Sequence, residues 1–467
     1  MHMKFVGRKK ELERLKTVYD KNSFQFVLMK GRRRIGKSEL IQESIRRCPY
    51  KAIYFQALDA NLEANLSSLN ALLCTTFFKD RRDYSSFELL LEDLFRFSSK
   101  EKFIFVIDEY PYLQNCFRNG SYLDSFLQRL IDSNRKTSQM KLVLLGSSSR
   151  IMNSLMKPEN ALYGRVDECI SLTNMDYYEV SSFYPLYSNE EKVMAYSIFG
   201  GSPFYAAQID QTLNVKQNVF QKIFANDVIL NSISDVLGKE LRNISLANMI
   251  FNQIARGIHN FNDLLKRVGN VAASSLDYSL KALEEMGLIR KITPINKERD
   301  KKKTFYYLDD FFLSFYYRYL FQNASSLAMM DHEQFYDVFI ETNLEKEYLP
   351  KAFEEITRQY FLRKNKEGYF DPPFIKIGKY WYDNPESKTN GEFDLVALNA
   401  KREYLFMECK YTKEALTAKD IEKEIKQVAA LHIPALHYGF CSKSGFELSD
   451  DYDKKHLTLL TLTDLYD

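Results

Sequence analysis

Tryptophan occurs once in this sequence of 467 residues, and glycine (17) and proline (11) are sparse, which indicates regular structure with short loops. No apolar run reaches the roughly 18 residues that a membrane-spanning helix needs. The N-terminal stretch MHMKFVGRKKELERL becomes charged too early for a signal peptide. The six cysteines are scattered without a C-x-x-C pair, a pattern typical of reduced cytosolic thiols. We therefore expect a cytoplasmic protein without disulfides or a membrane partner.

A strong charge of one sign is also lacking, because the formal net charge is only +3. Such a small excess does not by itself indicate a nucleic-acid partner, so any basic surface must be local. With 45% hydrophobic and 27% charged residues, the composition is that of an ordinary globular protein. The length exceeds what one hydrophobic core supports and predicts two to four domains.

The first motif that carries chemistry lies in FQFVLMKGRRRIGKSELIQESIRR, where an apolar strand, a loop and a helix follow one another. Gly31, Gly36, Lys37 and Ser38 fill the pattern G-x-x-x-x-G-K-S. Glycines let backbone N–H groups surround phosphates, and the helix N-terminus favours their negative charge. Lys37 would reach the β- and γ-phosphates of ATP, and Ser38 would bind Mg²⁺. Two neighbours in the same segment complete the expected nucleotide contacts, namely Arg34 and Glu39.

Two more apolar strands end in polar residues. KFIFVIDEYPYL runs continuously apolar from 103 to 107 and ends in Asp108 and Glu109. Asp108 would bind Mg²⁺ through water, and Glu109 would orient and polarise the attacking water. KLVLLGSSSR places Ser147 or Ser148 where a hydroxyl could contact the γ-phosphate. In YGRVDE, Arg165 is a candidate for contacting a phosphate from its own or a neighbouring subunit.

These motifs and their order resemble the archaeal-type ATPase family, in the STAND branch of the AAA+ superfamily. The resemblance rests on FVGRKKELERL, GRRRIGKS, IDEYPYL, LLGSSS, YGR and GGSPFY, and covers roughly residues 5 to 240. It implies a RecA-like P-loop core with a helical lid that uses ATP as a switch, often for assembly into a homo-oligomer. By position, Arg8 would flank the nucleotide base and Pro203 would open the lid. YGRVDE departs from the family because relatives tend to carry a second basic residue after the arginine.

The segment from 245 to 320 predicts three helices, in NMIFNQIARG, NFNDLLKRVG and SSLDYSLKALEEMG. Gly257, Gly269 and Gly287 fall where these helices should stop. The strand LIRKI, a basic loop and a short aromatic strand follow, and together they predict a winged helix-turn-helix. One interpretation places residues 274–281 in a DNA groove and 301–303 on phosphates. The other is a packing module, since acidic residues dilute the charge of the third helix.

The C-terminal hairpin GEFDLVALNAKREYLFMECKY holds charges inside two apolar strands. If its turn centres near Lys401, antiparallel pairing places Asp394 across from Glu408. Side chains alternate along a strand, so Glu408 and Lys410 project to the same side. Two buried carboxylates repel unless a cation lies between them, and hard oxygen ligands suit Mg²⁺ or Mn²⁺. The hairpin thus predicts a metal site.

A D-x13-E-x-K hairpin with an upstream helical glutamate resembles the PD-(D/E)XK nuclease superfamily. The resemblance implies a restriction-endonuclease-like fold in which Asp394 and Glu408 bind the metal. Lys410 would then be the catalytic amine and Glu354 the helix carboxylate. The chain reads Glu-Phe-Asp where the superfamily has Pro-Asp. The whole chain also resembles ATPases that join the archaeal-type head to such a tail of unknown function.

We therefore expect an α/β multidomain chain with an ATPase core (1–195), a lid (196–243), a winged helix (244–325) and a nuclease-like domain (326–467). The leading hypothesis is an ATP-hydrolysing switch coupled to Mg²⁺-dependent DNA cleavage, in DNA processing or defence. One alternative is a signalling or scaffold ATPase with an inactive tail. Another is a nucleotide-gated DNA-binding regulator that acts through the winged helix.

Overall fold

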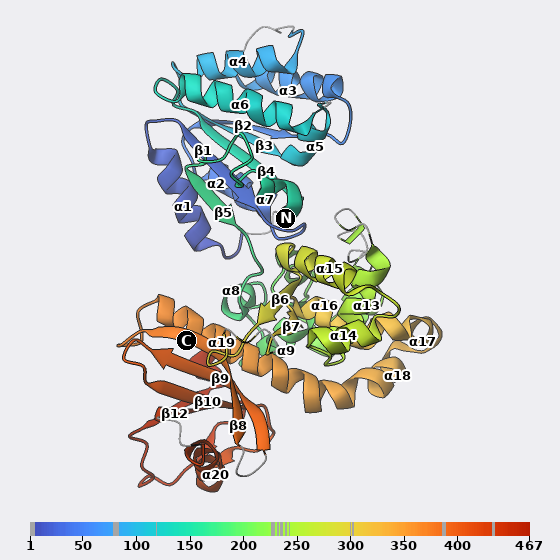
Figure 1. Cartoon of the computed structure of the whole chain (residues 1–467), viewed down its shortest axis with the longest axis vertical. Coiled ribbons are helices and arrows are strands. Elements are labelled where there is room, and N and C mark those ends of the chain that lie inside the picture. The colour runs from blue at the N-terminus through green and yellow to red at the C-terminus, as the bar shows by residue number, and fades with distance from the viewer. Residues whose placement is uncertain are drawn as a thin grey trace.

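The computed structural model describes residues 5–77, 84–117, 119–225, 229–230, 233, 237–238, 241, 243–298, 300, 303–384, 389–431 and 435–467. These residues form an N-terminal α/β layer structure, a central helical region with a small hairpin, and a C-terminal sheet (Figure 1). The expected mixed α/β, multidomain architecture is confirmed. No helix in the described part of the chain is long and apolar enough to span a membrane.

A five-stranded parallel sheet lies at the centre of the N-terminal part, in the order β2-β3-β4-β1-β5. The three apolar runs predicted as buried strands are confirmed as β1, β3 and β4. The strands are β1 (Gln25–Lys30), β2 (Lys51–Gln56), β3 (Phe103–Asp108), β4 (Lys141–Gly146) and β5 (Glu168–Ser171). Their carboxyl ends meet at one edge, where such sheets bind ligands.

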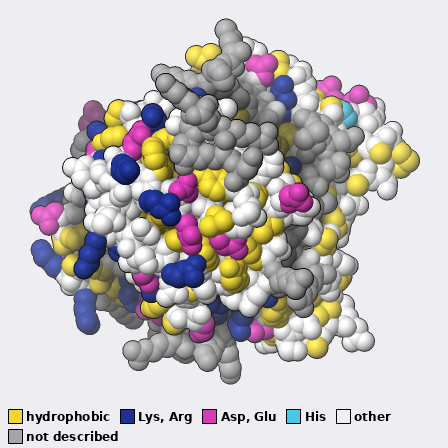
Figure 2. All heavy atoms as spheres, turned by 90° about the horizontal axis from the view of Figure 1, so that it is seen from above, with side chains coloured by type: hydrophobic (Ala, Val, Ile, Leu, Met, Phe, Trp, Pro, Cys, Tyr) yellow, Lys and Arg dark blue, Asp and Glu magenta, His cyan; other side chains and the backbone are white. Residues whose placement is uncertain are grey.

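Helices cover both faces of this sheet, which explains why its central strands are apolar throughout (Figure 1). The helices of this part are α1 (Lys9–Asp20), α2 (Lys37–Arg46), α3 (Leu62–Thr76), α4 (Phe87–Phe97), α5 (Tyr110–Asn115), α6 (Gly120–Asn134) and α7 (Ser149–Ser154). One apolar cluster lies between the sheet and α3, α4 and α6, and a second lies between the sheet and α1 and α2. Seen from the end of the molecule that carries α3, α4 and α6, acidic and basic side chains intermingle over the described surface (Figure 2).

The region from α8 to α16 is helical apart from one hairpin, and the lid (196–243) stays a predicted unit within it. Its elements are α8 (Tyr177–Ser181), α9 (Asn189–Phe199), α10 (Pro203–Ala206), α11 (Val215–Asn218), η1 (Val219–Phe224), α13 (Ile244–Ala255), α14 (Phe261–Arg267), α15 (Ala273–Glu285), β6 (Ile289–Ile292), β7 (Phe305–Leu308) and α16 (Phe311–Phe315). The predicted helix stops are confirmed, because Gly257, Gly269 and Gly287 follow α13, α14 and α15 with positive φ angles.

A run of short helical turns leads from this region to the long helix α19. The turns are η2 (Tyr316–Leu320), η3 (Phe321–Asn323), α17 (Ala324–Met329), α18 (His332–Tyr336), η4 (Asp337–Glu341) and η5 (Leu344–Tyr348), and α19 spans Leu349–Lys366. One apolar cluster continues from Met175 to Leu465 and includes side chains from the lid, the central region and the C-terminal sheet. The lid, the central region and the C-terminal part therefore share one hydrophobic core.

The C-terminal part is a mixed five-stranded sheet in the order β14-β12-β10-β9-β8. Its elements are β8 (Phe374–Asn384), β9 (Thr389–Asn399), β10 (Tyr404–Lys410), β11 (Leu416–Thr417), α20 (Ala418–Ala429), β12 (Ala435–Ser442), β13 (Phe446–Glu447), β14 (Leu457–Thr461) and α21 (Leu462–Tyr466). β8, β9 and β10 pair antiparallel, whereas β12 and β14 continue in parallel. Helix α19 packs on one face and α20 on the other (Figure 1).

Candidate functional site

The loop between β1 and α2 has the backbone geometry that a phosphate-binding loop needs. Gly36 adopts a left-handed conformation (φ 87°) directly before α2, which glycine tolerates without strain. A side chain at Gly31 would lie 2.7 Å from the carbonyl oxygen of Leu172, so the close approach of two backbone segments requires glycine there as well. Both predicted glycines therefore serve the loop geometry.

Lys37 is the first residue of α2, and its side chain turns back over the loop. Its ammonium donates hydrogen bonds to the carbonyl oxygens of Gly31 (2.7 Å) and Arg32 (2.9 Å). The amine thus lies beside the backbone N–H groups at the helix start. Cation, helix dipole and N–H groups act together on an anion at this position.

The ends of β2 and β3 supply polar groups to the same place. The Ser38 hydroxyl donates to Oδ2 of Asp108 at 2.7 Å, and the hydroxyl of Tyr54 donates to the same oxygen. Burial raises the pKa of Tyr54, and the nearby Asp108 carboxylate adds to this, so the phenol stays protonated as a donor. Tyr54 holds Asp108 in place, a role that the sequence pattern did not reveal.

Glu109 follows Asp108 in a left-handed conformation (φ 52°) that turns its side chain toward the end of β4. Its carboxylate accepts hydrogen bonds from the backbone N–H (3.2 Å) and the hydroxyl (2.9 Å) of Ser147. Of the two serines considered, Ser147 lies against the candidate catalytic carboxylate. The strand ends of β3 and β4 therefore come together as the sequence predicts.

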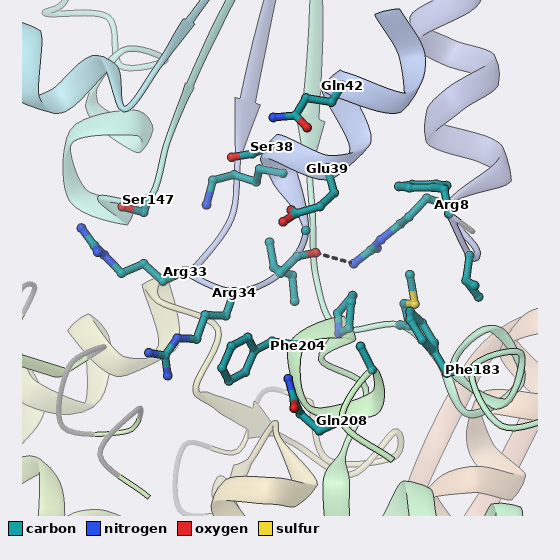
Figure 3. Close-up of a pocket in the computed structure, with 18 of the residues that line it drawn as sticks. Arg8, Arg33, Arg34, Ser38, Glu39, Gln42, Ser147, Phe183, Phe204 and Gln208 are labelled. Atoms are coloured by element: carbon teal, nitrogen blue, oxygen red, sulfur yellow. Dashed lines mark hydrogen bonds between the residues drawn. The ribbon is translucent and has the colours of Figure 1, made fainter. Parts of the chain in front are cut away.

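A cavity of about 770 Å³ opens between this edge of the sheet and the lid (Figure 3). It is lined by Phe5, Val6, Arg8, Arg33, Arg34, Ile35, Gly36, Lys37, Ser38, Glu39, Gln42, Arg46, Glu109, Ser147, Met175, Phe183, Pro203, Phe204, Ala207 and Gln208. The sequence motifs predicted nine of these residues. One end of the cavity is polar and lies at the phosphate loop, and the other is apolar and lies against the lid.

Arg8 closes the far side of the cavity. Its guanidinium donates to the carbonyl oxygens of Thr173 (2.6 Å) and Ile35 (3.4 Å), and its backbone N–H donates to Glu179 (3.1 Å). Burial lowers the pKa of Arg8, while Glu11 and Glu179 oppose this effect. Arg8 thus fixes the N-terminal segment to the phosphate loop, to Thr173 after β5 and to α8.

The apolar end of the cavity contains residues to which the sequence motifs assigned no role. They are Phe5, Val6, Met175, Phe183 and Phe204. Arg34 lies 4.5 Å above the ring of Phe204, next to Pro203 at the start of α10 (Figure 3). The hydroxyl of Ser202 donates to the carbonyl oxygen of Arg34 at 2.9 Å, which joins the lid to the phosphate loop. An apolar cleft of this kind suits a flat heterocyclic base.

The structure does not bring Arg165 to this cavity. Its guanidinium makes a paired contact with Asp132 of α6 (2.8 and 2.9 Å) and donates to the carbonyl oxygens of Ala161 and Tyr163. The hydrogen bonds that Arg165 donates to Asp132 raise the pKa of Arg165. Within one chain, Arg165 therefore stabilises the segment after β4 and does not reach the candidate phosphate position.

The second candidate site lies at the ends of β9 and β10. Met407 pairs with Leu395 and Tyr404 with Leu398, so the ladder places Glu408 next in line opposite Asp394. The register predicted from a turn centred near Lys401 is confirmed. The pairing of β8 with β9 shifts between Gly378 and Tyr380, so two residues of β9, including Asp394, face one residue of β8. Such a bulge re-aims a side chain, here that of Asp394.

Lys379, the β8 residue at this bulge, is the principal site residue that the sequence analysis missed. Its ammonium bridges Glu392 (2.8 Å) and Asp394 (2.9 Å), and its side chain is only 17% exposed. Burial lowers the pKa of Lys379, but the negative charges of Asp394 and Glu392 outweigh this effect and raise it overall. The signal that could have identified it is the second lysine of KIGKYWYDN (376–384), which lies among apolar and aromatic residues.

Lys410 bridges two carboxylates in the same way as Lys379. Its ammonium contacts Glu408 at 2.6 Å and Glu424 of α20 at 3.2 Å. Glu354 of α19 shares a hydrogen bond with Asp394 and also faces Glu408. Burial, followed by the charge of Asp394, raises the pKa of Glu354 to about 8. The four predicted residues Asp394, Glu408, Lys410 and Glu354 therefore do converge.

The donors at both candidate sites are hard oxygens, which suit Mg²⁺. Ser38 and Asp108 are in contact and could share one cation with a nucleotide. Burial is the main cause of the raised pKa of Glu354, and the neighbouring charge of Asp394 adds to it; a cation would offset both effects. As they stand, no three His, Cys, Asp or Glu side chains in the described part of the chain are arranged as a metal site. In the C-terminal cluster, lysines pair with the carboxylates instead.

Two family models match parts of the chain. Residues 5–209 match a model described as an ATPase domain predominantly from Archaea. Residues 316–425 match a model described as "Archaea bacterial proteins of unknown function". Together with the phosphate loop and parallel sheet, the first match identifies the N-terminal part as a P-loop ATPase domain, that is, a nucleotide-binding and ATP-hydrolysing unit.

The chain is also similar to other proteins over much of its length. An uncharacterized protein of Methanocaldococcus jannaschii is 28% identical over 453 residues, covering 96% of this chain and 94% of the relative. Among solved structures, the Walker-type ATPase of Pyrococcus abyssi aligns with a TM-score of 0.50 at 17% identity, over 67% of this chain and 96% of its own. This second likeness shows a shared fold. The ORC2 protein of Aeropyrum pernix aligns with a TM-score of 0.44 at 14% identity, over 66% of this chain and 92% of its own.

Proposed function

We propose that this protein is an ATP-controlled switch whose C-terminal domain cleaves phosphodiester bonds of DNA with the help of Mg²⁺. The observation that carries the proposal is the convergence of Asp394, Glu408, Lys410 and Glu354 from three separate elements onto one cluster. The proposal assigns residues 1–195 to the ATPase core, 196–243 to the lid, 244–325 to a winged helix-turn-helix and 326–467 to the nuclease-like domain.

In the ATPase domain, the contacts of several predicted residues support the roles proposed for them. Lys37 and the backbone N–H groups at the start of α2 would hold the β- and γ-phosphates. Ser38 and Asp108 would hold Mg²⁺, which neutralises phosphate charge. Glu109, held by Ser147, would orient the attacking water and accept its proton. The aromatic end of the cavity, beside Arg8 and Pro203, would hold the base.

In the C-terminal cluster, Asp394 and Glu408 would hold the cation, which would polarise the scissile phosphate. Lys410 would position the attacking water near the phosphorus or offset the negative charge that develops on phosphate oxygens. Glu354, whose pKa lies near 8, could share a proton with Asp394 before the cation binds. For Asp394 to take up the cation, Lys379 must give up its pair with that carboxylate.

Assembly and DNA contact are further parts of the proposal. Arg165 lies outside its own cavity, where it could meet the nucleotide of a neighbouring subunit if Asp132 released it. The central domain would contact DNA through residues 274–281 and the basic loop. Lys303 of that loop lies over the ring of Trp381, and Lys301 and Lys302 lie outside the described residues.

The direct test is incubation of supercoiled and linear DNA with Mg²⁺, with and without ATP. Wild type should cleave, whereas Asp394→Ala and Lys410→Ala should lose about 100-fold or more in rate. Exposed positions of the same domain, Lys401→Ala and Asp450→Ala, provide the matched controls. Cleavage that survives both site substitutions would rule out this assignment.

A second function is favoured by one specific observation, the pairing of Lys379 and Lys410 with the carboxylates. A cluster whose carboxylates are paired with lysines in this way could be a structural element of a signalling or scaffold ATPase that cuts nothing. Calorimetry with Mn²⁺ discriminates between the two functions. Binding that disappears in Glu408→Gln supports the nuclease, and no binding by the wild type supports the scaffold.

A further inference from the structure

The loop between β6 and β7 lies along the free edge of the C-terminal sheet. β8 is the last strand of that sheet. The backbone N–H of Ile295 donates to the carbonyl oxygen of Lys379 at 2.8 Å. The side chain of Asn296 donates to the carbonyl oxygen of Trp381 (2.7 Å) and accepts from its N–H (3.1 Å). The hairpin thus satisfies edge groups that would otherwise be open to another chain.

Side chains strengthen this contact. The ammonium of Lys303 lies 3.7 Å above the ring of Trp381, and Phe305 stacks on the same ring at 6.2 Å. At the start of β8, Lys376 forms an ion pair with Glu298 at 2.8 Å. Because lysine and aromatic side chains of the hairpin are used in this contact, they are not presented to DNA in this arrangement.

The hairpin also reaches the carboxylate cluster itself. The ammonium of Lys379 lies 5.7 Å from the ring centre of Tyr307 in β7, and His259 stacks on that ring at 4.3 Å. Asp394 and Glu392 remain 34% exposed, so water and ions reach them. A DNA duplex is much wider than a metal ion and therefore needs an open surface beside the cluster. The hairpin occupies that surface on the β8 side.

Shortly after Tyr307, the same segment is tied to the phosphate loop. Asp310 is buried and forms an ion pair with Arg32, a residue of the G-x-x-x-x-G-K-S loop. Arg32 also donates to Asn174 at 2.6 Å, and Asn174 contacts the carbonyl oxygen of Asp309. A ligand that repositions the phosphate loop would therefore act on the segment that carries β7.

We propose that the β6–β7 hairpin is an autoinhibitory cover of the C-terminal carboxylate cluster, held closed through the Arg32–Asp310 ion pair. Nucleotide phosphates in the loop weaken that pair, and the hairpin then leaves the β8 edge so that a nucleic-acid strand can approach. This regulation rests on the proposed function of the cluster. The movement of the hairpin itself can be measured without any cleavage.

The first measurement is amide hydrogen exchange of the segments 293–298 and 379–382, with and without a non-hydrolysable ATP analogue and Mg²⁺. We expect the analogue to increase exchange in both segments. Asp310→Asn, which can still cap α16, should increase it roughly tenfold without nucleotide because a charge-assisted hydrogen bond is lost. Asp331→Asn, a helix-capping aspartate of α18, is the matched control and should behave as wild type.

In the second measurement, an engineered disulfide holds the hairpin against β8. A Cβ atom at Gly378 would lie 3.1 Å from Cγ2 of Ile295, so cysteines at these positions can approach to disulfide distance. The oxidised double variant I295C/G378C should lose the nucleotide-dependent exchange, and reductant should restore it. Each single variant should respond like wild type under both conditions.

The outcomes separate the two proposals. The cover is overturned if nucleotide and Asp310→Asn both leave exchange unchanged, or if oxidised and reduced double variants cleave DNA equally. If exchange responds as expected but no sample cleaves DNA, the cover stands and the proposed nuclease activity fails. If cleavage occurs only in the reduced double variant, both proposals are supported.

Discussion

Ser38 donates its hydroxyl hydrogen to Asp108 at 2.7 Å, which joins the start of α2 to the end of β3. Both residues lie at the carboxyl edge of the sheet, and Tyr54 donates to the same carboxylate oxygen. The oxygens that should share Mg²⁺ are thus already in contact. Asparagine has the same shape as aspartate, and its amide oxygen can still accept the hydrogen bonds of Ser38 and Tyr54. Asp108→Asn therefore removes the negative charge while the contacts remain.

Asp108→Asn should reduce ATP hydrolysis about 100-fold, since the neutral amide is a much weaker ligand for Mg²⁺. Nucleotide binding should persist but should no longer increase on addition of Mg²⁺. Steady-state phosphate release and calorimetric titration with and without Mg²⁺ measure the two effects. Asp59→Asn, an exposed aspartate of the same domain, is the control. Mg²⁺-stimulated binding in Asp108→Asn would contradict the metal assignment.

Glu109→Gln should bind ATP as tightly as wild type while hydrolysing it roughly 100-fold to 10,000-fold more slowly. The amide can still accept hydrogen bonds from Ser147 but cannot take a proton from water. Single-turnover hydrolysis with saturating enzyme separates this loss from binding. The exposed Glu63→Gln of α3 should retain full activity. Weaker ATP binding with an unchanged rate would instead make Glu109 a binding residue.

Local patterns predicted the strand ends well because parallel strands deliver their last residues to one edge. The G-x-x-x-x-G-K-S motif predicted the positions of Gly36, Lys37 and Ser38. The apolar run from 103 to 107 predicted that of Glu109. The hairpin register was equally readable, since a short turn fixes both strands. These features depend only on neighbours in the chain.

Partners that are distant in sequence could not be read in this way. Arg32 pairs with Asp310, 278 residues later, and nothing near either residue indicates the other. Lys379 became part of the cluster only because a bulge in β9 brings Asp394 to it. Arg165 was expected near a phosphate of the nucleotide, but it forms an ion pair with Asp132 of α6 instead. Tertiary packing decided each of these pairs.

Lys379→Met should destabilise the protein by about 1–2 kcal/mol, because Glu392 and Asp394 lose their shared ammonium. The loss is limited since both carboxylates are one-third exposed and partly screened by water. Mg²⁺ should then stabilise this variant more than wild type, as a cation takes the place of the ammonium. Denaturant unfolding with and without Mg²⁺ measures both effects.

Lys376→Met is the matched control for that experiment. Lys376 lies on the same strand and pairs with Glu298 at the surface, so its loss should cost at most about 0.5 kcal/mol. Mg²⁺ should affect this control and wild type alike. An equal response of both variants to Mg²⁺ would show that the carboxylates around Lys379 do not attract a cation.

The final prediction concerns the pH dependence of stability and rests on His259. Burial lowers the pKa of His259 from 6.5 to about 4, although a hydrogen bond with Tyr306 opposes the shift. The folded protein therefore keeps this ring neutral, whereas the unfolded chain takes up a proton near pH 6.5. The contribution to stability is complete above about pH 6.5 and is lost as the pH falls to 4.

The size of this loss follows from the difference between the two pKa values and amounts to about 3 kcal/mol. His259→Gln should remove that part of the pH dependence, so the free energies of unfolding of variant and wild type should converge as the pH falls. Urea unfolding at several pH values between 4 and 7 measures the slope. Because His259 stacks on Tyr307, protonation should also loosen the β6–β7 hairpin, and exchange of 293–298 should rise in the same range. A slope that is unchanged in His259→Gln would show that other groups cause the acid sensitivity.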